Sequence, residues 1–250
     1  MRKILILFML PLSINIQAQI INTESMRMVT DTTGWSGLIG LNIAFSKNTK
    51  TLLRIKNTIH IQYKTNKHLV MFINKIGFES ADNADFVNKG VQHLRYNYYI
   101  NKKLAWEFFL QNQYNAISKI DFRELAGTGL RYKLSQSEKY KFYLGSTIMY
   151  EYEKTLESPN RVHKDWRNSN YFTFSLFFND NISLISTSYY QPNLAHFSDY
   201  RIAHQSALKF KVYKNLSFKT AFNFTYDTFP VVGIPKQEYE ITNGLVYRFD

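Results

Sequence analysis

Runs of alternating polarity, each about as long as a β-strand, fill this chain from Trp35 onward. One run places Leu53 and Ile55 on one side of the alternation and Arg54 and Lys56 on the other. Successive side chains of a strand point to opposite faces, so each such strand has one apolar and one polar face. The same division recurs in later runs, and it predicts an all-β protein.

Twelve runs can be counted, and the breaks between them alternate between short and long. The predicted strands are Trp35–Ser46, Thr51–Lys64, Lys67–Phe78, Phe86–Ile100, Lys103–Ala116, Phe122–Leu134, Tyr140–Glu153, Trp166–Phe178, Ile182–Tyr190, Ile202–Val212, Leu216–Asp227 and Glu238–Phe249. The longer breaks lie around Glu79–Phe86, Ala116–Glu124, Lys154–Lys164, Gln191–Tyr200 and Asp227–Gln237. An even strand number, with tight turns at one end and long loops at the other, is typical of outer membrane barrels. We therefore predict a 12-stranded antiparallel transmembrane (outer membrane) β-barrel over residues 34–250, with both chain ends in the periplasm.

The amino terminus has the pattern of a secretory signal peptide. Basic residues at positions 2 and 3 precede an apolar run over 4–12 and a small residue at Ala18. The apolar run is too short for a membrane-spanning helix, which needs about 20 residues. We predict a signal peptide over residues 1–18, a periplasmic lead-in segment over 19–33 and export to the cell outer membrane.

The chain is strongly basic and has no cysteine. Its formal net charge is +12, and removal of Arg2 and Lys3 with the signal peptide would leave +10. Without cysteine, neither disulfides nor a lipid-anchored start is available. For an exported protein, basic charge favours outer membrane lipids and lipopolysaccharide as partners over nucleic acid. We expect a monomer without a cofactor.

Alternation alone does not decide which face of the strands points outward. A soluble, lipocalin-like barrel would place the apolar face inside. However, about eight strands already enclose a filled interior, so twelve enclose more space than apolar side chains would fill. Trp35, Trp106 and Trp166 also share the apolar face and lie near strand ends, as in the aromatic girdles of membrane barrels. We predict that the apolar face points outward.

The last strand has the features of a signal for membrane insertion. Its apolar face carries Ile241, Leu245, Tyr247 and Phe249. A final strand with aromatic residues at alternate positions resembles the signal that the barrel-assembly machinery recognises. The chain departs from this pattern because Asp250 follows the terminal aromatic residue.

Three sequence stretches resemble a known family. They are QHLRYNY over 92–98, LAWEFFLQ over 104–111 and LAGTGLRY over 125–132. They are similar to the domain-of-unknown-function family 481 (DUF481), a Gram-negative family with members described as salt-induced outer membrane proteins. The resemblance covers most of the chain after the signal peptide and implies an outer membrane location. It implies no catalytic or binding residues.

The polar face is rich in charge and would line the barrel lumen. Lysines and arginines outnumber acids there by ten to five, Lys141 being one of the ten and the acids being Glu107, Glu151, Glu153, Asp227 and Glu240. The candidate lumen and solute residues are Arg54, Lys56, His60, Lys64, Arg95, Arg131, Lys209, Lys211, Lys219 and Arg248. Unpaired charges cannot stay in a dry interior, so either water fills the lumen or acids and bases interlock. These alternatives correspond to a narrow, porin-like pore for small anionic solutes and to a structural envelope protein.

Two other functions remain as alternatives. An outer membrane lipid hydrolase would need a Ser and a His in contact, and His204 and Ser206 share a face. Residues two apart on a strand have Cβ atoms about 7 Å apart, so we expect no hydrogen bond between them and no catalysis. A surface-binding protein would instead use long loops with exposed aromatic residues such as Phe197 or Phe229.

The sequence offers no metal site. Glu79, Asp82 and Asp85 fall in one of the longer breaks and could supply oxygen ligands to Ca²⁺. Their spacing matches no established calcium loop, and we interpret them as solvated loop charges.

Overall fold

The structure is a computed structural model that describes residues 33–47, 51–81, 84–135, 137, 139–157, 159, 161–214 and 216–247. Twelve β-strands make up the fold. They are β1 (Gly34–Lys47), β2 (Thr51–Lys64), β3 (His68–Ala81), β4 (Ala84–Tyr99), β5 (Leu104–Asn115), β6 (Ile120–Lys133), β7 (Tyr140–Thr155), β8 (Val162–Asn179), β9 (Ile182–Pro192), β10 (Tyr200–Tyr213), β11 (Leu216–Asp227) and β12 (Gln237–Tyr247). Within the described residues, no helix is long and apolar enough to span a membrane.

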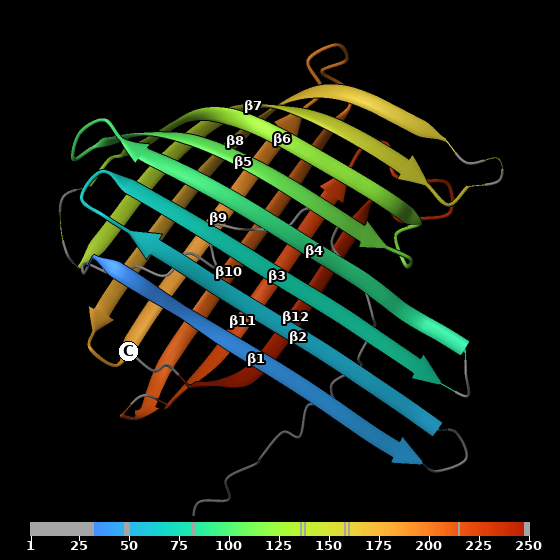
Figure 1. Cartoon of the computed structure of the whole chain (residues 1–250), viewed down its shortest axis with the longest axis horizontal. Coiled ribbons are helices and arrows are strands. Elements are labelled where there is room, and N and C mark those ends of the chain that lie inside the picture. Colours follow the sequence, from blue (N-terminus) through green and yellow to red (C-terminus); the bar gives the residue numbers. More distant parts are fainter. Residues whose placement is uncertain are drawn as a thin grey trace, which may run out of the picture.

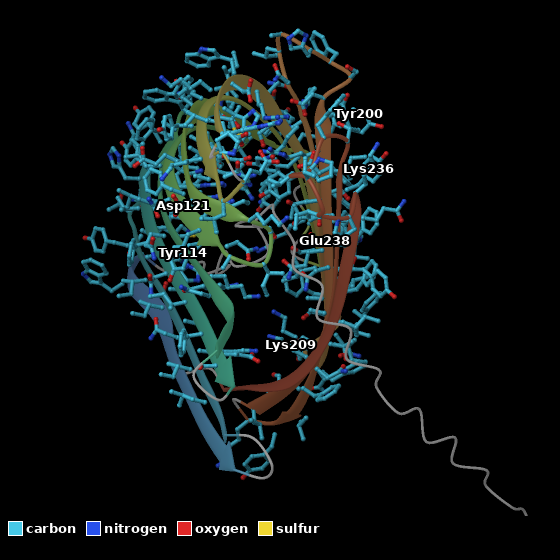
Figure 2. All side chains as sticks on the ribbon, turned by 90° about the vertical axis from the view of Figure 1, so that its right-hand side faces the viewer. Tyr114, Asp121, Tyr200, Lys209, Lys236 and Glu238 are labelled. Atoms are coloured by element: carbon cyan, nitrogen blue, oxygen red, sulfur yellow. The ribbon has the colours of Figure 1, made fainter. Side chains whose placement is uncertain are left out.

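The strands form one antiparallel sheet in sequence order. Each strand pairs with the next, and the sheet folds back so that β9 to β12 lie behind β1 to β5 (Figure 1). Seen from the side, the two walls of the barrel face each other with side chains between them (Figure 2). Among the described residues no hydrogen-bonded pairing joins β1 to β12, so a seam remains between the first and last strands.

All twelve predicted strands are present, although several bounds differ. The largest shift at a strand start is in β8, which begins at Val162 instead of Trp166 because Val162 continues the pairing with Lys154 of β7. The predicted long break between β3 and β4 is wrong. Pairing continues to Ala81 and Ala84, so only residues 82 and 83, outside the described part, separate these two strands.

Burial is inverted relative to a water-soluble protein. Buried polar side chains outnumber buried apolar ones among the described residues. In β5, for example, Glu107 is 1% exposed, whereas its neighbours Trp106 and Phe108 are 46% and 40% exposed. The strands therefore have the predicted orientation, with apolar side chains on the outer wall and polar side chains in the interior.

Two regions of the sequence fall outside this description. The predicted signal peptide over residues 1–18 lies wholly outside the described residues, as does the lead-in segment except for Thr33. The aromatic end of the last strand is described only as far as Tyr247. The signal peptide and the insertion signal therefore stay predictions.

Candidate functional site

Three buried arginines surround one buried glutamate inside the barrel. Glu151 of β7 accepts two hydrogen bonds from Arg201 Nη1 of β10, at 2.9 and 2.7 Å. Arg167 Nε of β8 lies 3.4 Å from the same carboxylate, and Arg123 Nε of β6 lies 3.9 Å from it. We call these residues, with Glu153 and Asp227, the Glu151 cluster. Its members come from five strands and meet inside the barrel because each points inward.

Every arginine of the cluster also has a second carboxylate. Arg123 forms an ion pair with Glu153, its register partner on β7. Arg201 Nε donates to Asp227 Oδ2 of β11 at 2.8 Å, and its Nη2 lies 3.7 Å from Glu153. Each guanidinium thereby bridges at least two acids, which is the arrangement that its planar set of donors favours.

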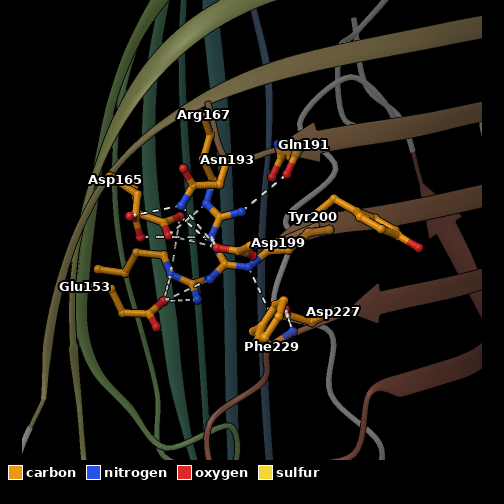
Figure 3. A network of polar contacts seen from close by, with 12 residues as sticks. Glu153, Asp165, Arg167, Gln191, Asn193, Asp199, Tyr200, Asp227 and Phe229 are labelled. Atoms are coloured by element: carbon orange, nitrogen blue, oxygen red, sulfur yellow. Dashed lines mark hydrogen bonds and ion pairs between the residues drawn. The ribbon is translucent and has the colours of Figure 1, made fainter. Parts of the chain in front are cut away.

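The cluster extends into the connection between β9 and β10 (Figure 3). Arg167 Nη2 donates to Asp199 Oδ2 at 2.7 Å. The side-chain amide of Asn193 donates to the same aspartate oxygen at 3.2 Å and to Asp165 Oδ1 at 3.0 Å. These contacts fix the connection to the inner wall of β8, at the end of the barrel opposite the short turns.

A second buried carboxylate lies nearer the short turns. Glu107 of β5 accepts a hydrogen bond from the Tyr171 hydroxyl of β8 at 2.6 Å. Arg95 Nη1 and Arg131 Nε lie 3.7 and 3.9 Å from it. Tyr171 reaches across β7 because its register partner there is Gly145, where a Cβ atom would collide with the tyrosine ring.

These ion pairs are deeply buried. Side chains of Arg123, Arg167 and Glu151 are each 2% exposed. Removing a single charge from water costs several kcal/mol, so the cluster can exist only because each charge has close partners of opposite sign. In this half of the barrel, acids and bases therefore interlock, as one of the two sequence-based alternatives required.

The half of the lumen near the short turns is more basic. Its inner wall includes Lys64, Arg95, Arg131, Lys141, Lys209 and Lys219, which all stand at strand positions whose side chains point inward. Glu107 is the one strand carboxylate of that inner wall among the described side chains. Lys209 and Lys219 are direct register partners on β10 and β11. Like charges opposite each other are unfavourable, so these two ammonium groups repel each other unless water or other charges screen them.

A small cavity lies beside Glu151, between the Glu151 cluster and the Arg95 and Tyr171 side chains. Its volume is about 40 Å³, and it is lined by His93, Gln111, Thr147, Met149 and Ser169, together with members of both charged groups. A water molecule takes up about 30 Å³ in the liquid, and one probe-sized site needs about 10–15 Å³, so the cavity has room for a few waters. The lumen is therefore constricted at this level.

The structure places the predicted lumen residues in different surroundings. Arg95, Arg131 and His60 are buried, Lys64, Lys209 and Lys219 are half-buried, and Lys211 is exposed. Lys56 is also exposed and pairs with Glu79 at 3.4 Å. The side chain of Arg54 and the whole of Arg248 lie outside the described part of the chain, as does the side chain of Glu240. Whether any of these residues meets a solute stays a prediction.

Sequence reasoning missed the three arginines of the Glu151 cluster. Arg123 and Arg167 lie inside predicted strands, at positions whose side chains point inward. The alternation could therefore have identified them as lumen residues. Arg201 precedes the predicted start of its strand at Ile202, but β10 begins at Tyr200. In the part of the chain that the structure describes, no group of three His, Asp or Glu side chains could hold a metal ion.

Comparisons with known proteins agree with this architecture. The family model described as "Protein of unknown function, DUF481" matches residues 39–249. No curated protein matches the chain. A solved structure of the NanC porin has a TM-score of 0.52 at 8% identity, covering 84% of this chain and 100% of that chain. A bacterial polysaccharide outer membrane secretin has a TM-score of 0.48 at 8% identity, covering 87% of this chain and 86% of that one. Pseudomonas aeruginosa OpdL has a TM-score of 0.37 at 8% identity, with 85% and 80% covered.

Proposed function

Because this chain belongs to the DUF481 family of proteins of unknown function and has a porin-like fold, we propose that it is a narrow outer membrane pore for small anionic solutes. The observation that carries the proposal is the separation of charge along the lumen. The half near the short turns is basic, and the Glu151 cluster holds interlocked charges in the other half.

The outer wall supports the membrane location. Large apolar side chains cover it, including Leu94, Leu110, Leu130 and Ile148, each at least 44% exposed. A surface of this kind is unstable in water but suits lipid acyl chains. Trp106 and Trp166 lie near opposite ends of the barrel on the same wall, where aromatic residues of membrane barrels meet the lipid headgroups.

The lysines opposite each other on β10 and β11 support the preference for anions. Rings or pairs of like charge select ions of opposite sign in narrow pores. Since the cavity beside the Glu151 cluster holds only a few waters, we expect a small conductance and exclusion of bulky solutes.

A planar bilayer tests this function directly. The purified protein should give small conductance steps, and the reversal potential across a salt gradient should indicate anion preference. Exchanging Lys209→Glu and Lys219→Glu together should shift the reversal potential toward cations, because the inner wall near the short turns then becomes acidic. Lys67→Glu is the matched control, since Lys67 lies at the same barrel end but is exposed in the connection between β2 and β3.

Two results would contradict the proposal. The absence of conductance steps would leave a closed, structural envelope barrel in which the charged network only stabilises the fold. An unchanged reversal potential in the double variant would show that the lysine pair does not face the solute.

The connections at the barrel end opposite the short turns favour a second candidate function, surface binding. Phe197 and Phe229 are each 65% exposed in the β9–β10 and β11–β12 connections. Val232 joins these loops to others, since its carbonyl accepts from Lys119 Nζ at 2.8 Å and its N–H donates to Glu157 Oε1 at 3.1 Å. If this end binds apolar partners, Phe197→Ser with Phe229→Ser should reduce capture of nanodisc-embedded protein on a phenyl matrix. Equal capture would argue against this function.

A further inference from the structure

A cluster of hydrogen-bonded Ser and His side chains lies on the outer, apolar wall of the barrel. His204 Nδ1 of β10 is 2.8 Å from Ser188 Oγ of β9, its register partner. His204 Nε2 is 2.9 Å from Ser206 Oγ, and this oxygen is 2.9 Å from Ser186 Oγ. The sequence-based expectation that His204 and Ser206 do not touch is therefore wrong, because the imidazole ring turns along the strand toward the serine.

The four side chains can form one continuous chain of donors. If Ser188 donates to Nδ1 of His204, then Nε2 carries a proton and donates to Ser206, which donates to Ser186. In this assignment Nδ1 of His204 is the atom that can accept the proton of Ser188. The hydrogen bond from Nε2 to Ser206 holds the imidazole ring in place. A nucleophile next to a base, with the base oriented by a third group, is the arrangement of covalent acyl transfer.

The surroundings of the cluster are apolar on both sides. Phe172 of β8 is the register partner of Ser188, and Phe222 of β11 is the register partner of Ser206. The rings of His204 and Phe222 lie 6.3 Å apart. Phe172 and Phe222 are 38% and 39% exposed, so they form an apolar surface beside the polar cluster.

The cluster also lies just inside an aromatic belt. Tyr190, two residues beyond Ser188 on β9, has its ring 5.6 Å from that of Tyr200, which in turn lies 6.0 Å from Tyr226. Aromatic belts mark the headgroup level of a bilayer, and two residues of a strand span about 7 Å. Ser188 is therefore at the depth where the acyl ester bonds of membrane lipids begin.

We propose that Ser188 and His204 form a catalytic site for hydrolysis of long-chain acyl esters of membrane lipids, with Ser188 as the nucleophile. Ser188 is the assigned nucleophile because it is exposed, whereas Ser206 is half-buried and Ser186 is buried. Ser206 is a positioning residue that holds the imidazole. The proposal rests on the proposed membrane location but not on the pore.

The reaction needs only water as a co-reactant. Ser188 Oγ bonds to the ester carbonyl carbon while His204 Nδ1 takes the serine proton. The ester C–O bond then breaks, and the leaving alcohol receives that proton from His204. Water next attacks the acyl-serine and gives a proton to His204. Collapse of this intermediate releases the fatty acid and returns the proton to Ser188.

The neighbouring strand β8 carries an outward amide diagonal to Ser188. Asn170 of β8 is the register partner of Tyr190 and thus a diagonal neighbour of Ser188, within about 7–8 Å between backbone positions. Its side chain points outward and donates to Asn168, which leaves a second N–H on the same nitrogen. This N–H is the group that we assign to the negative oxygen of the tetrahedral intermediate.

The contacts between amide side chains on the outer wall lack this chemistry. Gln92 donates to Asn74 at 3.0 Å, and Asn74 donates to Asn57 at 2.9 Å, so three amides on β2, β3 and β4 satisfy one another. Amides supply neither a nucleophile nor a base. The Ser–His cluster differs because it contains both within hydrogen-bond distance.

The test uses the full chain reconstituted in vesicles of phosphatidylethanolamine and phosphatidylglycerol and, separately, with purified lipopolysaccharide. Release of fatty acid from one of the two identifies the lipid class. Ser188→Ala and His204→Gln should each lower the rate at least about a hundredfold, as expected for loss of a nucleophile or general base. Thr128→Ala is the matched control, because Thr128 is an exposed outward hydroxyl of β6 that accepts a hydrogen bond from Trp106 Nε1 and lies away from the cluster on β9 and β10.

Two further measurements separate catalysis from packing. A fluorophosphonate ester should label Ser188 covalently, as read by mass spectrometry, and the label should disappear in His204→Gln. Ser206→Ala should lower kcat with little change in KM, and Ser206→Thr should restore most of it. Bilayer conductance should be the same in all of these variants, since the cluster faces away from the lumen.

Specific outcomes would overturn the proposal. They are the absence of fatty acid release from both lipid classes, release that persists in Ser188→Ala, and labelling of a residue other than Ser188. Because conductance is measured independently, failure here leaves the pore proposal intact, and failure of the pore leaves this one intact.

Discussion

At the scale of single residues, Glu151 is the centre of a buried network of charges. It contacts three arginines from three different strands, and each arginine carries a full charge in a buried position. Loss of the glutamate charge would remove one carboxylate partner from each of these arginines. Removing one partner of a buried ion pair is far more costly than removing an exposed one.

We expect Glu151→Gln to lower the free energy of unfolding in detergent by about 3–5 kcal/mol. Urea-induced unfolding followed by tryptophan fluorescence measures this change. Asp121→Asn is the control, because Asp121 pairs with Lys154 at 2.7 Å with both side chains more than a third exposed. That variant should lose no more than about 1 kcal/mol. Similar losses in both variants would show that the Glu151 cluster is hydrated rather than dry.

At the scale of elements, the alternation along each strand assigns one wall to lipid and one to the lumen. In β7, Ile148 is 51% exposed between Thr147 and Met149, which are both buried. Leu156 follows the same strand and is 46% exposed in the connection to β8. The two side chains are thus similarly exposed, but Ile148 would meet acyl chains and Leu156 would meet water.

This difference gives a direct test of the membrane location. Ile148→Arg should reduce the stability of the inserted barrel by about 2–4 kcal/mol, the cost of arginine near the bilayer midplane. Leu156→Arg should have almost no effect, because arginine there is in water. The measurement is the urea dependence of folding into vesicles, read by heat-modified gel mobility. Equal and small effects of the two changes would mean that the outer wall of β7 does not face lipid.

At the scale of the whole molecule, burial is opposite to that of a soluble barrel. The interior holds charged and polar side chains, and the surface carries Leu, Ile and aromatic residues from most strands. Such a surface is stable only when something apolar covers it.

The purified protein should therefore be folded and monodisperse in detergent micelles, and it should aggregate when the detergent is removed. Size-exclusion chromatography with light scattering checks both states and the expected monomer. A folded, monodisperse protein in plain buffer would refute the outward orientation of the apolar face, along with the pore and the lipid-hydrolysis site.

Much of the fold could be predicted because the underlying signal is local. Two-residue periodicity depends only on the geometry of the strand, so it indicated all twelve strands and their apolar face. The errors were at the ends of strands. Pairing with a neighbour extends β8 to Val162 and continues the hairpin between Ala81 and Ala84, and local patterns do not contain that pairing.

The contacts of the candidate sites were decided by the tertiary structure. Parity showed that Glu107 and Glu151 face inward, but not that Tyr171 reaches Glu107 or that Arg201 reaches Glu151. These residues are far apart in sequence, and they meet only because strands on different parts of a curved sheet face one enclosed space. The contact of His204 with Ser188 and Ser206 likewise depends on strand register and ring orientation. The sequence by itself determined which side of each strand is polar, since that is a property of neighbouring residues. Which polar groups meet was settled by the curvature and register of the sheet.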